Sequence, residues 1–537
     1  MYIVTTQQMQ AAEKAADAAG LTYDQMMENA GHAVAQAIDA EIDAAGASVL
    51  ILVGPGNNGG DGLVAARYLA QIGAVVTVYV WKRNTDGDKN WALLDATGVE
   101  RVLSSDSDSP ARLAHLLDEA DIIVDALLGT GVSRPIEGTL AELLDQTKAA
   151  ITRRRDPRAD TDLIDPAYPN SEADMTPVVV ALDVPSGLNS DTGAVDPHTL
   201  PADLTITLAA VKLGHILLSG PGVVGQLVVG DIGLTANYYP GDVTLEMATA
   251  ANVAAMLPKR PPDAHKGTFG TALIVGGCIY YSGAVMLAGQ AALRIGPGLV
   301  TLAPPKTIQP VVASRVTEAT YWPLPDHEGL LTPEAVLRLK EKLADASALL
   351  VGPGLGLSDS TTNFIRELLA GFDVPLPLVL DADALNILAK QGNGWWKLLP
   401  GNSILTPHPG EMARLMGSTT PEVQANRLQT AMDMAKKGEQ IILLKGAHTI
   451  VAAPDGRTMV LPFANPALAK AGSGDVLAGA IVGLLAQGMP PFEAAVAGAY
   501  MHGLAGELAR DSIGATAVVA GDLVGFLPLA TRMVRGE

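Results

Sequence analysis

Cysteine is almost missing from this chain of 537 residues, which contains only Cys278. A single cysteine excludes a disulfide within the chain and argues against a metal cluster built on several cysteines of one chain. The sequence also lacks an apolar run long enough to cross a membrane, and its first residues lack the basic start and apolar core of a secretion signal. We therefore expect a cytoplasmic protein with no membrane partner.

Positive charge is scarce as well. Asp and Glu (57) outnumber Lys and Arg (36), which gives a formal net charge of -21 at pH 7. Such an acidic surface repels nucleic acid, so an anionic ligand would be held by local N–H groups or by a few cations. We expect small-molecule ligands and no nucleic-acid partner.

What is present is a globular composition, with 48% hydrophobic and 17% charged residues, and with 56 glycines and 35 prolines spread along the chain. The spread indicates tight turns between buried strands, and the length predicts roughly two to four domains. From residue 48, short apolar strands alternate with amphipathic helices, which is typical of a doubly wound, largely parallel sheet. Residues 152–176 break this pattern with charge and proline, and we interpret them as a surface insertion.

The alternation pauses at residues 235–262, where prolines and a change in charge predict a domain boundary. A second α/β series follows, with expected strands that include 441–453 and an apolar helical segment from about residue 472. The halves share no sequence repeat. We therefore predict two different α/β domains, residues 1–236 with a Rossmann-like doubly wound sheet and residues 245–537.

A glycine-rich segment, VGPGNNGGDG at 53–62, lies between an apolar strand and a helix. Glycines let the backbone approach a ligand closely, and the free N–H groups of a helix start favour a phosphate. The spacing matches neither of the two common phosphate-binding motifs. A tight turn that serves packing alone is the other interpretation, and Asn57, Asn58 and Asp61 weigh against it because a plain turn needs few polar side chains.

Two further strand ends carry polar groups: Asp125, followed by GTGVSRP at 129–135, and Asp183, followed by PSG at 185–187. In a parallel sheet these ends face the same crevice as the glycine-rich turn. Carboxylate, amide and hydroxyl oxygens could enclose a monovalent cation, while a remaining carboxylate serves as a base. Helix capping or turn formation is the alternative for either aspartate alone.

These three segments occur in order and closely resemble the NAD(P)H-hydrate epimerase domain over about residues 1–236. The resemblance implies that potassium is held by Asn58, Asp125 and Ser186. It implies substrate contacts at Asn57, Asn58, Gly59, Gly60, Asp61, Gly129, Thr130, Gly131, Val132, Ser133, Arg134, Pro135 and Asp183.

The most informative motif of the second half is AGSGDVLAG at 471–479. Gly472 and Gly474 open an apolar helix whose free N–H groups can stabilise a transferring phosphoryl group, and Asp475 is placed to take a proton from an attacking hydroxyl. The segment KGAHT at 445–449 supplies a lysine at a strand end, which a nucleotide-binding site would need. The alternatives are a plain glycine-rich helix cap and, for His408 in TPHPGE, a buried hydrogen-bonded histidine.

This second set resembles the ADP- or ATP-dependent NAD(P)H-hydrate dehydratase domain, which has a ribokinase-like fold, over about residues 245–537. The family often has GGTGD where this chain has AGSGD, but Ser473 keeps the hydroxyl. The resemblance implies nucleotide contacts at Lys445, Gly446, Ala447, His448, Thr449 and Gly474, and hydrate contacts at Ala284, Gly354, His408 and Asp475.

Together the resemblances imply repair of NADH or NADPH hydrated at C6 of the nicotinamide ring. One domain would interconvert the R and S epimers with Asp183 as base, and the other would dehydrate the S form with ADP or ATP, Mg²⁺ and Asp475 as base. Two rivals stay open: a kinase of a small alcohol, and a non-catalytic nucleotide sensor, which has no need of Asp475. We expect a homo-oligomer; the sequence does not give its size, nor the preference between ADP and ATP.

Overall fold

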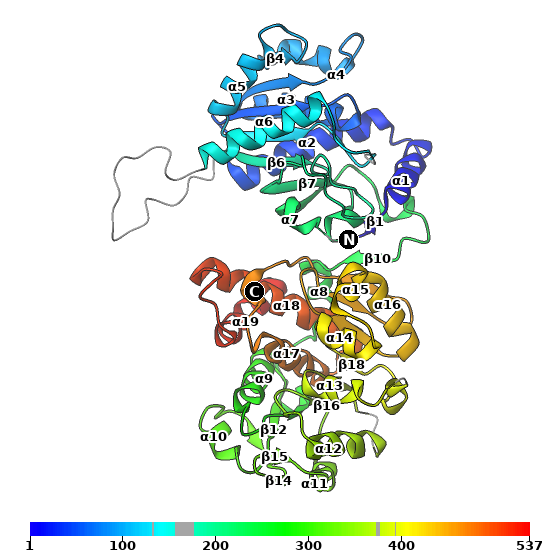
Figure 1. The fold of residues 1–537 in the computed structure, drawn as a ribbon, viewed down its shortest axis with the longest axis vertical. Coiled ribbons are helices and arrows are strands. Elements are labelled where there is room, and N and C mark those ends of the chain that lie inside the picture. Colours follow the sequence, from blue (N-terminus) through cyan, green and yellow to red (C-terminus); the bar gives the residue numbers. More distant parts are fainter. Residues whose placement is uncertain (132–133, 156–176, 218, 372–375, 393) are drawn as a thin grey trace, which may run out of the picture. The chain divides into compact units, whose positions relative to one another are not determined.

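Figure 1 shows the computed structural model, which describes residues 1–131, 134–155, 177–217, 219–371, 376–392 and 394–537. The chain divides into two compact units, Met1–Thr244 and Leu245–Glu537. Val132, Ser133 and most of the insertion expected at 152–176 lie outside the described residues. The start of that segment is not an insertion, because helix α6 (Thr139–Arg154) continues through it, with two arginines in its last turn where a helix dipole favours positive charge.

Seven described strands of the first unit form a parallel sheet in the order β4-β3-β2-β5-β6-β7-β9. The chain reverses its direction of winding between β2 and β5, as the prediction of a doubly wound sheet requires. The strands are β2 (Ser48–Val53), β3 (Val75–Val80), β4 (Glu100–Leu103), β5 (Ile122–Ala126), β6 (Val178–Leu182), β7 (Leu204–Leu208) and β9 (Gln226–Gly230). A short parallel pair lies beside them, β1 (Ile3–Val4) and β8 (Val211–Lys212).

Helices cover both faces of this sheet (Figure 1). Alternate residues of β2 face opposite ways, so Ile51 packs in one core cluster with α2 and α3, and Leu52 packs in another with α5 and α6. The polar ends of the strands therefore lie at one edge of the sheet, beside the point where the order of the strands reverses. The remaining helices of the unit are α1 (Thr6–Ala18), α2 (Tyr23–Ile42), α3 (Asn57–Ile72), α4 (Lys89–Ala92), α5 (Ser109–Glu119) and α7 (Pro221–Val224).

Ten described strands of the second unit form one sheet in the order β10-β21-β20-β19-β18-β17-β16-β11-β12-β13. Only β20 among them runs antiparallel to its neighbours. The single strand expected at 441–453 is thus wrong: β19 ends at Leu444, KGAHT forms the turn, and β20 returns beside β19. The strands are β10 (Leu245–Met247), β11 (Thr271–Val275), β12 (Leu299–Ala303), β13 (Thr320–Tyr321), β16 (Ala348–Val351), β17 (Leu378–Leu380), β18 (Ile404–Leu405), β19 (Ile441–Leu444), β20 (Ile450–Ala452) and β21 (Thr458–Val460), with a separate hairpin of β14 (Asp326–His327) and β15 (Leu330–Leu331).

The apolar helix α17 (Ser473–Ala486) lies at the centre of this unit and is buried along most of its length. Close packing on α9 (Ser282–Ile295) requires glycine at 479, because a Cβ there would lie 2.1 Å from the Ala288 carbonyl oxygen. The remaining helices are α8 (Ala250–Met256), α10 (Gln309–Ala313), α11 (Ala335–Leu343), α12 (Asp359–Ala370), α13 (Asp383–Ala389), α14 (Pro409–Met416), α15 (Thr420–Ala425), α16 (Arg427–Gly438), α18 (Pro491–Ile513) and α19 (Ala520–Arg535). In the described part of the chain, no helix has the length and apolar content to cross a membrane.

Candidate functional site

The glycine-rich turn between β2 and α3 has two separate functions. A Cβ at Gly54 would lie 1.8 Å from the Leu127 carbonyl oxygen, and one at Gly59 would lie 2.0 Å from the Gly54 carbonyl oxygen. These glycines let the chain pack on itself. A Cβ at Gly56 would meet open space, and α3 starts there with no side chain capping its N–H groups. Room for a ligand beside this helix start is therefore provided at Gly56.

A cavity of about 990 Å³ lies at this edge of the sheet, and helices α1 and α2 close its other side. Of the residues expected to bind substrate, it is lined by Asn57, Asn58, Asp61, Gly129, Thr130, Gly131 and Asp183. Among the described residues, Gly59, Gly60, Arg134 and Pro135 are not part of this lining. The cavity is also lined by Glu13 and Lys212, which the sequence analysis missed.

Asp183 is held in one orientation by a buried lysine. Its Oδ1 accepts hydrogen bonds from the Leu208 N–H and the Thr207 hydroxyl, both 3.0 Å long, and from the Lys212 ammonium. Lys212 is only 1% exposed. Burial opposes ionisation of Asp183, but the charge and hydrogen bonds of Lys212 outweigh it and hold the pKa of Asp183 below its usual range. Asp183 also has a left-handed backbone (φ 64°), a conformation uncommon outside glycine and often found at functional sites.

Two other carboxyl groups of the cavity have raised pKa values, in contrast to Asp183. Burial, together with the negative charge of Asp183, raises the pKa of Asp61 well above its usual value. Burial also raises the pKa of Glu13, against the attraction of Lys212. The cavity therefore contains one carboxyl group whose pKa is depressed and a neighbouring one whose pKa is raised, a pairing that favours acid–base chemistry.

The three residues expected to hold potassium converge beside this cavity. The Ser186 hydroxyl donates to Asp125 Oδ1 over 2.6 Å, and the Ser186 N–H donates to Asp125 Oδ2 over 2.8 Å. The Leu128 N–H donates to the Ser186 hydroxyl oxygen over 3.0 Å, and Asn58 Nδ2 donates to the Leu128 carbonyl over 2.8 Å. Among the described contacts, the Asn58 amide oxygen accepts no hydrogen bond. One carboxylate among neutral oxygens suits a large monovalent cation better than Mg²⁺.

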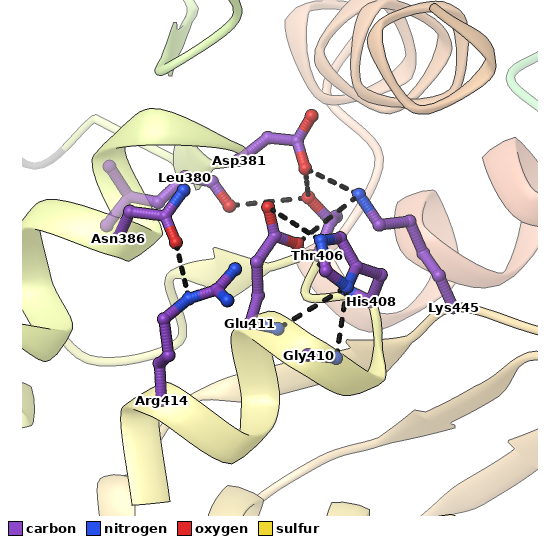
Figure 2. A network of polar contacts seen from close by, with 9 residues as sticks. All are labelled: Leu380, Asp381, Asn386, Thr406, His408, Gly410, Glu411, Arg414 and Lys445. Atoms are coloured by element: carbon purple, nitrogen blue, oxygen red, sulfur yellow. Dashed lines mark hydrogen bonds and ion pairs between the residues drawn. The ribbon is translucent and has the colours of Figure 1, made fainter. Parts of the chain in front are cut away.

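In the second unit, Figure 2 shows a polar network that includes Lys445, Asp381, Thr406 and Glu411. The Lys445 ammonium lies 2.9 Å from Asp381 Oδ1 and 3.8 Å from Glu411 Oε2, and the Thr406 hydroxyl donates to Asp381 Oδ1 over 2.7 Å. Burial disfavours the charge of Lys445, but the two carboxylates outweigh it and raise the pKa of Lys445. Lys445 therefore presents a fixed positive charge at the end of β19.

His408 caps helix α14 (Figure 2). Its Nδ1 accepts hydrogen bonds from the Gly410 and Glu411 N–H groups over 3.0 and 3.4 Å. Partial burial and the charges of Lys445 and Arg414 lower the pKa of His408 to about 4, so the ring is neutral at pH 7. Half of the side chain is exposed, which contradicts the alternative of a buried histidine.

Two cavities meet at the start of α17. One, of about 480 Å³, is lined by Asp475 with Ala284, Gly354, Tyr280 and Tyr281. The other, of about 640 Å³, is lined by Gly474 with Lys445, Gly446, Ala447, Thr449 and His408. Gly474 and Asp475, adjacent at the start of one helix, thus face different cavities. The residues expected to bind hydrate line the smaller cavity, and those expected to bind nucleotide, apart from His448, line the larger one. His408 is the other exception, because it was expected to bind hydrate but lines the larger cavity.

His448 lines neither of these cavities. Its backbone is left-handed (φ 48°), its N–H donates to the Phe463 carbonyl over 2.8 Å, and its Nδ1 lies 3.2 Å from the Leu461 carbonyl oxygen. The His448 side chain therefore holds the turn against the segment after β21.

Asp475 has an unusually high pKa for an aspartate. Burial, assisted by the charge of Asp381, raises the pKa of Asp475 to about 7, and Lys445 opposes the shift. A base is most effective when its pKa lies near the working pH. Asp381, Glu411 and His502, whose Nε2 lies 3.0 Å from the Ser473 hydroxyl, are further polar residues around this helix start that the sequence analysis missed.

Comparisons with known proteins match both units. The family described as YjeF-related protein N-terminus matches residues 23–214, and the family described as NAD(P)H-hydrate dehydratase matches residues 272–528. The bifunctional NAD(P)H-hydrate repair enzyme Nnr of Moorella thermoacetica is 38% identical, over 100% of this chain and 98% of that protein. The enzyme of the same name from Escherichia coli is 33% identical, over 96% of this chain and 90% of that protein.

A solved structure, ADP/ATP-dependent NAD(P)H-hydrate dehydratase from Bacillus subtilis co-crystallised with ATP/Mg²⁺, is 34% identical, with a TM-score of 0.46 over 54% of this chain and 98% of that one. The full-length relatives favour cofactor repair over a small-alcohol kinase or a sensor. The chain therefore belongs to the family of bifunctional NAD(P)H-hydrate repair enzymes, in which an epimerase domain is joined to a dehydratase domain.

Proposed function

We propose that the first cavity interconverts the R and S epimers of NAD(P)H hydrate, and that the two cavities at the start of α17 dehydrate the S epimer at the expense of ADP or ATP. One observation carries the second assignment: Gly474 and Asp475 are adjacent but face different cavities. Phosphoryl transfer between two ligands requires such an arrangement, with a base on the acceptor side and N–H donors on the donor side. Asp183 and its buried lysine support the first assignment.

In dehydration, Asp475 accepts the proton of the C6 hydroxyl while the hydroxyl oxygen attacks the terminal phosphorus of the nucleotide. The P–O bond to the leaving nucleotide breaks, which gives AMP from ADP or ADP from ATP. The ring nitrogen then supplies the electron pair that expels phosphate from C6, and loss of the C5 proton restores the double bond of NAD(P)H. Lys445 and the N–H groups at the start of α17, which line one cavity, would stabilise the charge on the transferring group.

Mg²⁺ would accompany the nucleotide and neutralise part of its phosphate charge. In the part of the chain that the structure describes, no three His, Cys, Asp or Glu side chains are grouped to hold a metal ion. The ion would therefore be bound mainly through the phosphates, as is usual for magnesium nucleotides.

In epimerisation, Asp183 accepts the C6 hydroxyl proton while Asp61 gives a proton to the ring nitrogen, and the C6–N bond breaks to an aldehyde. Rotation of the aldehyde and the reverse steps close the ring with the hydroxyl on the other face, and both protons return. The opposite pKa shifts of the two side chains in one cavity support these roles.

Potassium would be held by Asn58, Asp125 and Ser186. The donor set favours it, and so does the Asn58 amide oxygen, which accepts no hydrogen bond from the described residues. When bound, it would supply positive charge at the edge of the cavity and attract the phosphates of the hydrate.

The test is an assay of the purified chain with mixed epimers of NADHX, following recovery of the reduced-nicotinamide absorbance with ADP or ATP. We expect complete recovery from the native chain. Asp183→Ala should recover the S fraction quickly and the R fraction only at the spontaneous rate, and Asp475→Asn should recover neither. Recovery without added nucleotide would contradict the proposed dehydration.

A further inference from the structure

One partly buried arginine, Arg427, contacts the backbone of the turn KGAHT (445–449). Arg427 is the first residue of α16. Its guanidinium donates to the carbonyl oxygens of Ala447 over 3.2 Å, Lys445 over 3.3 Å and Leu444 over 3.5 Å. A Cβ at Gly446 would lie 2.3 Å from Arg427 Nη1. A side chain at position 446 would therefore displace the Arg427 guanidinium from this contact.

This contact fixes the direction of one peptide group. The carbonyl of Lys445 and the N–H of Gly446 belong to the same planar trans peptide, so they point in opposite directions. Because the carbonyl faces Arg427, the Gly446 N–H faces away from it, and Gly446 lines the cavity with Gly474. In the described residues this N–H donates to no protein acceptor, whereas the N–H groups of Lys445 and His448 donate to the Pro407 and Phe463 carbonyls.

Arg427 also carries a charge that no carboxylate balances. In the part of the chain that the structure describes, no Asp or Glu forms an ion pair with it, and its remaining side-chain contact is the Gln424 amide oxygen at 3.1 Å. Burial lowers the pKa of Arg427 to about 10, which still leaves it charged at neutral pH. A partly buried cation facing only neutral acceptors favours an anion nearby.

We propose that Arg427 is a positioning residue for the nucleotide: it turns the Gly446 N–H toward the phosphates and supplies an unbalanced positive charge behind the turn. The inference rests on the proposed nucleotide site. It does not require Arg427 to touch the ligand, because the side chain acts through the backbone of residues 444–447 and through its charge.

The prediction separates nucleotide binding from the remaining steps. Arg427→Met removes the charge and all three hydrogen bonds, so the Kd for ADP should rise at least about tenfold, which corresponds to about 1.4 kcal/mol. The KM for the hydrate should stay within about twofold, since Ala284, Gly354 and Asp475 line the other cavity. Arg427→Lys keeps the charge but lacks the planar guanidinium that donates to all three carbonyl oxygens. Its Kd for ADP should therefore lie between those of the native chain and Arg427→Met.

The experiment measures ADP binding to the full chain by calorimetry, with dehydration kinetics at varied ADP and varied hydrate. Lys436→Met is the matched control, because it removes one positive charge from an exposed position of the same helix. Epimerisation by the same samples reports on the first domain, and the KM for the hydrate reports on the fold of the second domain. We expect native ADP binding from Lys436→Met and native epimerisation from every variant.

Lys445→Met separates the inference from the proposed site on which it rests. If Lys445→Met weakens ADP binding and Arg427→Met does not, the nucleotide site stands and the role of Arg427 is wrong. If neither variant weakens ADP binding, the nucleotide site itself is wrong. If Arg427→Met raises the KM for hydrate as much as the Kd for ADP, Arg427 merely supports the fold. If Arg427→Lys binds ADP as tightly as the native chain, the three hydrogen bonds of the guanidinium are not needed.

Discussion

Asp61 and Asp183 line the same cavity, yet their pKa values are displaced in opposite directions. The difference is due to Lys212, whose ammonium is bonded to Asp183 and only weakly affects Asp61. One buried cation thus keeps one carboxylate ionised, and the negative charge of that carboxylate helps its neighbour to retain a proton. Each of the two aspartates can be tested separately.

Lys212→Met should raise the pKa of Asp183, because a buried carboxylate would lose its counter-charge. In the native chain that pKa is depressed, so Asp183 stabilises the fold above its unfolded pKa of about 3.9, and this stabilisation is lost as the pH falls through the folded value. Epimerisation measured between pH 4 and 8 should therefore be lost at a higher pH in the variant than in the native chain.

Loss of a buried pair also costs about 3–5 kcal/mol, so the first domain should melt earlier. Lys212→Arg, which keeps the charge, controls for this effect. An unchanged pH profile in a folded Lys212→Met protein would mean that Lys212 does not set the ionisation of Asp183.

Asp61→Asn tests the acid. Asparagine keeps the size of the side chain but carries no acidic proton, so epimerisation should fall by about 10²- to 10⁴-fold. Stability should not decrease, because burial and the charge of Asp183 disfavour the ionised form of the native side chain. The measurement is chromatography of the two epimers over time, with dehydration of the pure S form as the control. Native epimerisation by Asp61→Asn would leave Asp61 as a binding residue only.

Much of the fold and part of each site could be predicted from the sequence because both depend on local patterns. Apolar strands alternating with helices indicated the doubly wound sheet, and strand ends then placed Asp125 and Asp183 at one edge. Lys212 could not be found in this way. It lies in an apolar stretch and reaches Asp183 only because β7 pairs with β6 and β8 follows β7 directly, which is a long-range contact.

The second domain shows the same limit at KGAHT. The apolar residues on both sides predict one long strand, but the left-handed backbone at His448 and the extended contact with Arg427 reverse the chain there. Arg427 precedes the turn by 18 residues and Asp381 precedes Lys445 by 64, so neither spacing is visible as a motif. The glycines raise a related difficulty. Gly54 is needed for close packing within the protein, whereas Gly56 faces open space, and the sequence alone does not distinguish these two roles.

Dehydration should increase with pH through about 7, because Asp475 must lose its proton before it can act as the base. The raised pKa also means that the native chain loses stability as the pH rises from the unfolded value of about 3.9 to about 7. Asp475→Asn should abolish dehydration, keep epimerisation, and lack this loss of stability. The measurements are kcat/KM for the S hydrate and thermal melts from pH 5 to 9. A dehydration rate that does not vary over this range would contradict the assignment of Asp475 as the base.

Potassium should activate epimerisation, and protons should compete with it. Asp125 is completely buried, and burial raises its pKa against the hydrogen bonds from Ser186, so a cation bound there would replace a proton on the carboxyl group. The potassium concentration for half-maximal epimerisation should therefore rise as the pH falls toward the pKa of Asp125. Asp125→Asn deletes the only full charge among Asn58, Asp125 and Ser186, so it should need far more potassium at every pH and lose the pH dependence of that requirement. The assay varies potassium against choline at constant ionic strength, with sodium as a second control and dehydration of the S form as the internal reference. If the native rate is the same in potassium and choline, Asp125 only fixes the turn at Ser186, and the charge that positions the hydrate must come from Lys212.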